Sequence, residues 1–271
     1  MNGASREALA AARERLDALT DNTSVDATKL ADELAAVTAL LDREVSLRRV
    51  LTDPAQAGEA KAELAQRLLG GQVGGETADL LAGMVRSRWS QSRDLADALE
   101  ELANTADLTA AQRAGTLDDV EDELFRFGRI VSSSTELRAA LTNRAAAASA
   151  KGELLRSLLG GRAKATTERL VTRLVTAPRG RSLESGLESL SKLAAERRDR
   201  MVAVVTSAVP LSDQQKQRLG AALAKLYGRT MHLNLDVDPE VVGGIRVQVG
   251  DEVINGSLAD RIEDAGRRLA S

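Results

Sequence analysis

Acid–base or metal chemistry in this chain would have to come from one histidine and a few carboxylates near the C-terminus. His232 is the only histidine, and it falls on the polar face of a predicted strand in a sequence without cysteine. Asp236 and Asp238 lie along that strand, whereas Asp251 and Glu252 lie in a predicted turn. A hard-cation site needs several converging oxygens, and Asp beside Pro or Gly is typical of turns. The sequence therefore predicts a surface role for the histidine and neither a catalytic nor a metal site.

Glycine-rich stretches raise the alternative of a phosphate-binding loop. Residues 70–75 read GGQVGG, but the Lys–Ser/Thr pair of a phosphate loop is missing. The corresponding pair in a later segment, Gly160–Gly161, is followed by RAKATTE. Both runs are therefore interpreted as helix–helix loops, and Gly243–Gly244 as a sharp backbone turn into a strand. No cofactor is expected.

A cluster of arginines, Arg197, Arg198 and Arg200, lies at the predicted end of a long helix. Cations at that end interact favourably with the helix dipole, which accounts for the cluster without any ligand. Contact with phospholipid or with an acidic partner is the alternative interpretation.

Composition excludes several classes of protein. The chain has 271 residues, 43% of them hydrophobic but only 1% aromatic, so its core must consist of Leu, Val and Ala. Ala and Leu favour helices. A net charge of −3 gives no electrostatic footprint for nucleic acid. The absence of cysteine excludes disulfides and thiol catalysis, and no run of apolar residues is long enough to predict a membrane span.

An internal repeat at a shift of 90 residues organises the first 200 residues. Asp32, Glu33 and Leu34 recur as Asp122, Glu123 and Leu124, and after a gap of two residues the stripe Arg93, Leu95, Leu99, Leu102 recurs as Arg181, Leu183, Leu187, Leu190. Two copies of one helical unit explain this pattern. Further positions that recur 90 residues later are Leu47, Arg48, Leu51, Thr52, Lys61, Glu63, Leu64, Leu68, Leu69, Gly70 and Gly71.

Each copy is predicted to be an antiparallel helical bundle. Helices are expected near 5–19, 26–43, 46–51, 55–69, 76–87 and 90–104, and again near 94–114, 118–131, 135–141, 145–159, 164–176 and 182–200. Pro54 is placed at a helix start, and Gly70–Gly71 is expected to end a helix in the left-handed conformation. The helix near 94–104 could close the first copy or open the second. The expected domains are 1–104, 105–200 and 201–271.

The C-terminal segment has an α/β pattern. Residues 202–208 are a β-branched run, and Ser212 with Gln215 forms a capping-box signature for a helix that ends at Gly228. Residues 231–237 and 245–249 alternate in hydrophobicity, which predicts half-buried strands whose inward side chains include Leu233, Leu235, Val247 and Val249. Gly250–Asp251 is a predicted hairpin turn, and Ser257 with Asp260 is predicted to cap a last helix. The fold class is mainly α, with two tandem bundles followed by a small α/β domain.

The same C-terminal segment carries a set of residues at fixed spacing that matches a known family. These residues are Val205, Ser207, Ala208, Pro210, Leu211, Ser212, Val237, Asp238, Pro239, Gly243, Gly244, Val247, Val249, Gly250, Asp251, Val253, Ile254, Gly256 and Ser257. On these positions the segment resembles the delta subunit of F-type ATP synthases, the family that includes the mitochondrial oligomycin-sensitivity-conferring protein. Asn255 departs from the family pattern, which usually has Asp there. The duplicated helical part resembles actinobacterial members of the family.

The resemblance implies a non-catalytic peripheral-stalk (stator) subunit on the cytoplasmic face of a bacterial membrane. It implies that the helical domain binds the N-terminal helix of an α subunit, that the C-terminal domain holds the C-terminal end of the b subunit, and that the chain resists rotor torque. A generic helical adaptor outside the ATP synthase is the alternative, and an enzyme is disfavoured because reactive groups are lacking. The extra bundle is expected either to bind a second α-subunit helix or to act as a spacer along the stalk.

Overall fold

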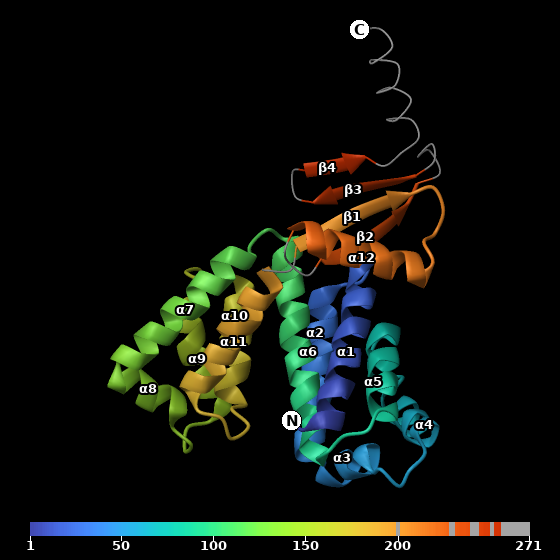
Figure 1. Ribbon diagram of the computed structural model, residues 1–271. Coiled ribbons are helices and arrows are strands. Elements are labelled where there is room, and N and C mark those ends of the chain that lie inside the picture. Colours follow the sequence, from blue (N-terminus) through green and yellow to red (C-terminus); the bar gives the residue numbers. More distant parts are fainter. Residues whose placement is uncertain (199–200, 228–230, 239–243, 250–251, 256–271) are drawn as a thin grey trace, which may run out of the picture. The chain divides into compact units, whose positions relative to one another are not determined.

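The computed structural model describes residues 1–198, 201–227, 231–238, 244–249 and 252–255. The chain divides into two compact units, Met1–Arg197 and Arg198–Ser271. The first unit is helical and the second holds a four-stranded sheet (Figure 1). The prediction of a mainly α chain with a small α/β part at its C-terminal end is therefore confirmed.

The helices of the first unit repeat at a shift of 90 residues. After α1 (Gly3–Asp21), the helices α2 (Ala27–Arg43), α3 (Val45–Thr52), α4 (Gly58–Leu69) and α5 (Gly75–Arg86) recur as α7 (Leu117–Ser133), α8 (Thr135–Thr142), α9 (Ala148–Leu159) and α10 (Ala165–Thr176). Between the two sets lies α6 (Ser92–Arg113), and α11 (Leu183–Arg198) follows the second. The order and lengths of the helices thus agree with the predicted duplication.

The long helix α6 belongs to both copies. Its first half carries Leu95, Leu99 and Leu102, which are fully buried in the core that contains α1, α2 and α5. Its second half carries Leu108, which begins a second core with α7, α10 and α11. The sequence leaves open whether the helix near 94–104 closes the first copy or opens the second, and the structure shows that the two copies share it. We call α1–α5 with the first half of α6 bundle one, and the second half of α6 with α7–α11 bundle two; a domain boundary at 104/105 stays a prediction.

A glutamate repeats the same capping contact in each bundle. In bundle one, Glu33 on α2 accepts hydrogen bonds at the start of α5 from the Gly74 backbone N–H at 2.9 Å and from Thr77 Oγ1 at 2.5 Å. In bundle two, Glu123 on α7 accepts from the Lys164 N–H at 2.9 Å and from Thr167 Oγ1 at 2.5 Å. A carboxylate at a helix N-terminus satisfies free N–H groups and interacts favourably with the helix dipole. The repeated Asp–Glu–Leu sequence therefore fixes the second helix of each bundle against the fifth.

Two details of the predicted helix ends are wrong. Pro54 lies in a turn, and α4 begins only at Gly58, because the Asp53 side chain accepts a hydrogen bond from the Ala55 N–H and forms a turn. The helix does end at Leu69, but Gly70 has φ −61° and ψ −19°, a right-handed conformation. The turn closes instead through the Gln72 and Val73 N–H groups on the Leu69 carbonyl. In the second copy, Gly161 has φ 70°, which is the left-handed conformation.

The second unit contains a mixed sheet and one described helix. Strands β1 (Met201–Ser207), β2 (Met231–Val237), β3 (Ile245–Val249) and β4 (Glu252–Asn255) lie in the order β2-β1-β3-β4. β1 and β2 are parallel and joined through α12 (Asp213–Tyr227), whereas β3 is antiparallel to β1 and β4. The predicted capping box is present, because Ser212 N–H donates to Gln215 Oε1 at 2.8 Å and Gln215 N–H to Ser212 Oγ at 3.3 Å. Gly244, with φ 95°, turns the chain into β3 as expected.

The core of the sheet confirms most of the predicted inward residues. Val247 and Val249 pack with Val205 and Leu223, and Leu233 packs against the same cluster. Leu235 is 37% exposed, so its inward placement was wrong. β2 is an edge strand, and α12 covers it at Leu233, whose Cδ1 lies near Gly220, but leaves Leu235 partly open. The predicted turn at Gly250–Asp251 and the predicted last helix lie outside the described residues.

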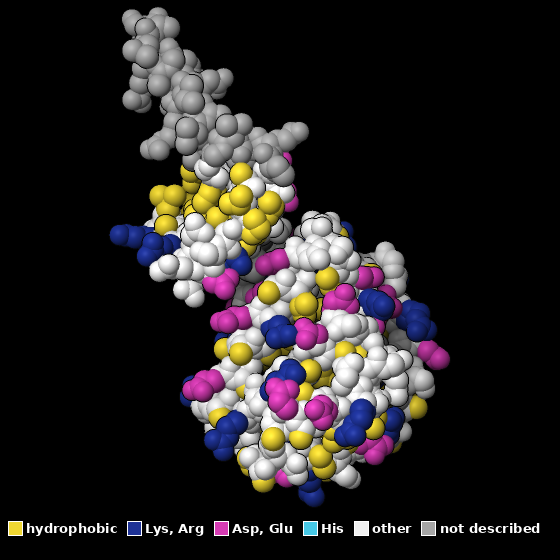
Figure 2. Space-filling view, turned by 90° about the vertical axis from the view of Figure 1, so that its right-hand side faces the viewer, with side chains coloured by type: hydrophobic (Ala, Val, Ile, Leu, Met, Phe, Trp, Pro, Cys, Tyr) yellow, Lys and Arg dark blue, Asp and Glu magenta, His cyan; other side chains and the backbone are white. Residues whose placement is uncertain are grey.

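The surface of the helical unit carries charges of both signs. Figure 2 shows Lys/Arg and Asp/Glu side chains interspersed over one face of it, without a single-sign field of the kind that attracts nucleic acid. In the described part of the chain, no helix has both the length and the apolar character of a membrane span.

Candidate functional site

Each bundle carries a groove between its fourth and fifth helices. In bundle one the groove lies between α4 and α5, and in bundle two between α9 and α10. Their volumes are about 680 and 410 Å³. The lining occupies equivalent positions in the repeat, in the pairs Ala62/Gly152, Gln66/Arg156, Gly75/Ala165, Ala78/Glu168, Asp79/Arg169, Ala82/Thr172 and Arg86/Thr176. The duplication has therefore preserved a groove and changed its lining.

The two linings differ in their chemistry. In bundle one, Ala62, Ala78 and Ala82 form an apolar floor, of which Ala62 and Ala78 are buried, and charged side chains stand at the rim. Alanine presents little bulk, so a helix could approach this floor closely. In bundle two a glycine, a glutamate and a threonine occupy the three equivalent positions, and Asp32 of bundle one reaches into the groove to pair with Arg169 at 2.6 Å. The bundle-one groove is the larger and the more apolar of the two.

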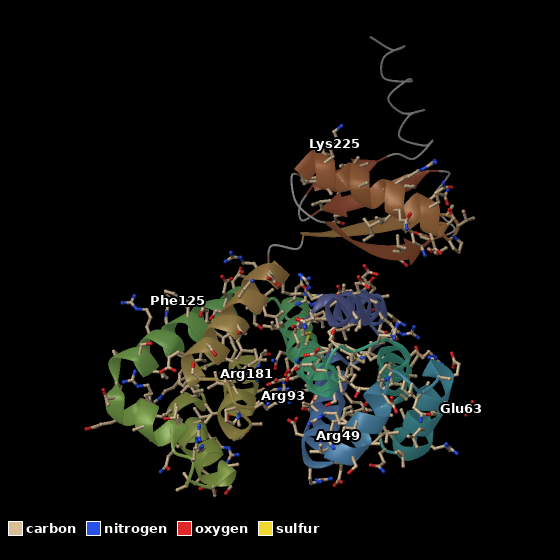
Figure 3. The ribbon with its side chains drawn as sticks, turned by 60° about the horizontal axis from the view of Figure 1, so that its bottom comes forward. Arg49, Glu63, Arg93, Phe125, Arg181 and Lys225 are labelled. Atoms are coloured by element: carbon tan, nitrogen blue, oxygen red, sulfur yellow. The ribbon has the colours of Figure 1, made fainter. Side chains whose placement is uncertain are left out.

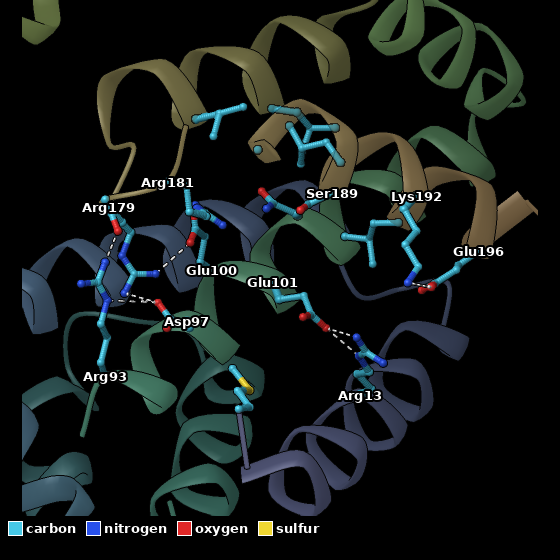
Figure 4. A pocket seen from close by; sticks show the side chains of 18 residues that line it. Arg13, Arg93, Asp97, Glu100, Glu101, Arg179, Arg181, Ser189, Lys192 and Glu196 are labelled. Atoms are coloured by element: carbon cyan, nitrogen blue, oxygen red, sulfur yellow. Dashed lines mark hydrogen bonds and ion pairs between the residues drawn. The ribbon is translucent and has the colours of Figure 1, made fainter. Parts of the chain in front are cut away.

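Arg179, in the loop between α10 and α11, makes several ion pairs between the two bundles. The Arg179 side chain is 5% exposed and pairs with Glu100 at 2.8 Å, with Asp97 at 2.9 Å, and with Asp42 on α2, to which Nη2 donates at 3.1 Å. Arg181 pairs with the second oxygen of Glu100, and Arg93 donates to the Arg179 carbonyl. We call this cluster the arginine junction, and Figure 4 shows its members other than Asp42 beside the cavity that they border.

The energetics of Arg179 favour a structural role for the junction. Its backbone has φ 52°, a left-handed conformation that costs about 1–2 kcal/mol in a residue other than glycine. Burial by itself would lower the pKa of Arg179, but hydrogen bonds to Asp42 and Glu100 and their charges raise it above its usual value. The guanidinium therefore stays charged at every accessible pH. The ion pairs with three carboxylates offset this strain. Only a guanidinium has enough N–H donors, in a suitable geometry, to bind all three carboxylates at once.

Buried aspartates at equivalent positions extend the junction along α1 and α6. Asp107 on α6 is 1% exposed and binds Arg169 at 2.9 Å and Arg173 at 2.8 Å, both from α10. Its counterpart in the repeat, Asp17 on α1, binds Arg197 of α11 at 2.7 Å. Ion pairs with a buried carboxylate are hydrogen-bonded and are costly to break from one side. They hold the two bundles in one orientation, consistent with a single compact helical unit.

The cavity beside the junction has a volume of about 580 Å³ and lies among α1, α6, α10, α11 and the loop that joins α10 to α11. Its charged side chains are matched within the wall, since Lys192 pairs with Glu196 at 3.8 Å and Arg13 pairs with Glu101. A catalytic site needs a nucleophile or a base with a perturbed pKa in such a cavity. Paired charges and leucines make up most of the cavity lining, which is typical of a packing space between helices.

The arginine cluster at the end of α11 does not offer all of its members to a ligand. Arg197, for which contact with a lipid or an acidic partner was the alternative interpretation, is 8% exposed and bound to Asp17 and Gln112 inside the helical unit. Arg200 lies outside the described residues. The buried ion pair of Arg197 therefore replaces the helix dipole as the main reason for an arginine at this position.

The carboxylates and the histidine of the second unit do not form a described site. Asp236 is exposed on β2, and Asp238 follows the end of that strand. Asp251 lies outside the described residues, as do the side chains of His232 and Glu252. Among the residues that the structure describes, no group of three or more His, Cys, Asp or Glu side chains could hold a metal ion.

Sequence reasoning missed the junction itself. Asp17 and Asp107 are one more identical pair at the 90-residue shift, and a buried position on two leucine-lined helices could have marked them. Arg179 carried no such signal, because neither Trp89, 90 residues earlier, nor Gln91, 88 residues earlier, is an arginine. An arginine in a Pro–Arg–Gly turn looks like an exposed loop residue. Only the approach of the two bundles buries it.

Comparison with known proteins identifies the family of the chain. The family model described as "ATP synthase delta (OSCP) subunit" matches residues 105–269, which comprise most of bundle two and the second unit. The chain belongs to this family. ATP synthase subunit delta of Streptomyces coelicolor is 85% identical over 100% of this chain and 99% of its own length, that of Streptomyces griseus 83% identical over the full length of both, and that of Thermobifida fusca 48% identical over the full length of both.

Membership of the delta family makes the chain a peripheral-stalk subunit of the F-type ATP synthase, with a part in ATP synthesis and proton transport. The alternative of a generic adaptor has no support. The delta-family match begins within α6, at the start of bundle two. Bundle one therefore lies outside the matched segment, although the Streptomyces and Thermobifida delta subunits align with it over its whole length.

Proposed function

We propose that the chain fastens the catalytic head of the ATP synthase to its stalk through helix-binding grooves and supplies no catalytic residue. The helical unit takes N-terminal helices of α subunits, and the second unit holds the C-terminal end of the b subunit. The chain works peripherally on the cytoplasmic face of the bacterial membrane and resists the torque of the rotor. Helix-in-groove recognition suits this task because it gives slow dissociation without chemistry.

The observation that carries the proposal is the repeated groove. A groove at equivalent positions of two bundles supports two helix-binding sites on one chain, of unequal quality. The alanine floor of bundle one favours the tighter contact, and the charged lining of bundle two the weaker one. For the extra bundle, this supports a second α-subunit helix over the spacer interpretation, since the groove keeps its apolar floor and lies open.

The arginine junction gives the two sites a fixed spacing. Two sites linked on one chain raise the effective concentration of the second contact to about the millimolar range, and avidity can rise about 100-fold when the geometry allows both contacts. A fixed orientation of the two bundles keeps both grooves in a position to bind at the same time. The shared helix α6 and the ion pairs of Asp107 and Arg179 support this rigid spacing.

Ala78→Arg should weaken binding of an α-subunit N-terminal helix by about tenfold or more, equivalent to about 1.4 kcal/mol or more. Ala78 is buried in the floor of the bundle-one groove, so an arginine there would fill the space that a helix needs. The measurement is calorimetric titration of an α-subunit N-terminal peptide into the full chain. The full chain is required because α6 is shared, and a fragment that ends at residue 104 would cut that helix.

The control for this titration is Ala10→Arg, which adds the same charge at an exposed alanine of α1 outside the groove. Its affinity should stay within about twofold of the parent value. Equal affinity of the Ala78→Arg variant and this control, with both folded, would contradict a helix-binding role for bundle one.

A further inference from the structure

A face that is covered in bundle one is open in bundle two. In bundle one the face formed by α2 and α6 is covered by α10 and the loop that follows it, through Arg169, Arg173 and Arg179. Ala96 and Ala103 on α6 are fully buried there. The repeat places the equivalent face of bundle two on α7 and α11. A groove of about 530 Å³ lies on it, and the described helices leave it open.

The open groove has the surface of a helix-binding site. Phe125, which replaces Ala35 of bundle one, is 59% exposed, and Figure 3 labels it on α7. Gly128 and Ser132 beside it carry little bulk, and Leu187 forms the floor from α11. Large exposed aromatic side chains in a groove are typical anchors of protein interfaces. The chain has only two phenylalanines, and one of them stands exposed here.

The charged residues of the groove determine which charges a helix docked there must carry. Glu188 on α11 is the counterpart of Glu100, which binds Arg179 and Arg181 in bundle one. In the groove of bundle two, Glu188 has no ion-pair partner among the described residues. Arg129, on the α7 wall of the groove, likewise has no ion-pair partner among them. A helix that fits between them carries a cation on one flank, a carboxylate on the other, and an apolar stripe between.

The α5 helix of a second copy lacks the groups with which α10 covers bundle one. The covering helix α10 meets bundle one with Arg169 and Arg173. The equivalent positions on α5 are Asp79 and Gly83, and Asp79 is already paired with Arg15 of α1 at 2.6 Å. An α5 helix from another copy would therefore bring no arginine to the α7–α11 face, where Asp122 occupies the position of Asp32. The repeat thus favours a helix of a partner protein as the occupant.

We propose that the groove of α7 and α11 is a third docking surface, which takes one amphipathic helix of a partner protein in the position that α10 occupies on bundle one. This rests on the proposed function, because the partner is another subunit of the assembled ATP synthase. The helix seats an apolar side chain between Phe125 and Leu187 and a lysine or arginine opposite Glu188.

The test places the photo-crosslinker p-benzoylphenylalanine at Phe125 of the full chain within the assembled ATP synthase. Ile130 is the matched control position, because it is 52% exposed on the same helix but outside the groove. We expect Phe125 to crosslink to one helical segment of another subunit, with a Lys or Arg one or two turns away, at several times the yield from Ile130.

Affinity gives the second arm. Phe125→Asp and Glu188→Lys should each weaken rebinding of the chain to ATP synthase stripped of it by about tenfold, and Ile130→Asp by less than about twofold. Crosslinking to a second copy, to residues 198–271 of the same chain, or at the Ile130 yield would overturn the inference, as would equal affinity of all three variants. If the parent chain still rebinds and restores coupling in that case, the proposed function stands and only this docking surface fails.

Discussion

Arg179→Ala should lower the free energy of unfolding of the helical unit by about 3–5 kcal/mol, since it leaves buried carboxylates without their cation. Glu100 is 4% exposed and would keep only Arg181, while Asp42 and Asp97 would lose their inter-bundle contact. Relief of the left-handed backbone does not offset this loss, because alanine adopts that conformation no more readily than arginine. Urea unfolding followed by circular dichroism at 222 nm measures the change.

The matched control for this loss is Arg43→Ala, which removes an arginine from an exposed pair with Glu44. Exposed pairs contribute about 0–1 kcal/mol, so this variant should unfold almost as the parent does. Equal stabilities of the Arg179→Ala and Arg43→Ala variants would mean that the junction does not join the bundles.

Val247→Asp should unfold the second unit and spare the first. Val247 is buried in a small cluster with Val205 and Val249, so an aspartate there would bury a charge without a partner. The cost is about 4 kcal/mol or more, a large part of the stability of so small a unit. The two compact units have separate cores, and the helical unit should keep its own transition. Thermal melting with hydrogen exchange separates the two units.

Val253→Asp is the control for the sheet, because Val253 on β4 is 39% exposed and its aspartate stays in water. We expect a change of less than about 1 kcal/mol. Loss of the helical transition in Val247→Asp would mean that the two units unfold together, and an unchanged melt would mean that the strand face is misassigned.

The sequence predicted the features that are local. The order and approximate positions of the helices followed from Ala/Leu composition and the 90-residue shift, and the Ser212–Gln215 capping box formed as its residue types require. Inward placement held for Val247 and Val249 on a central strand. It failed for Leu235, because alternation gives the face of a strand but not whether a helix covers it at the sheet edge.

Features that depend on two bundles meeting could not be predicted. Arg197 lies in the last turn of a helix, which favours the helix dipole as its explanation, yet its partner Asp17 lies 180 residues away in the sequence. Arg179 pairs with carboxylates of α2 and α6 that nothing in the local pattern assigns to it. The sharing of α6 is undecidable from one stripe of leucines, since both cores need apolar residues at helical spacing.

Proton-driven ATP synthesis by membranes stripped of this subunit, with and without the purified full chain, tests most directly whether the chain holds the head to its stalk without chemistry of its own. We predict that the chain restores synthesis at a stoichiometric amount and that it hydrolyses no ATP by itself. Membranes that rebind the chain without recovering synthesis, or ATP turnover by the chain alone that survives repurification, would contradict this role.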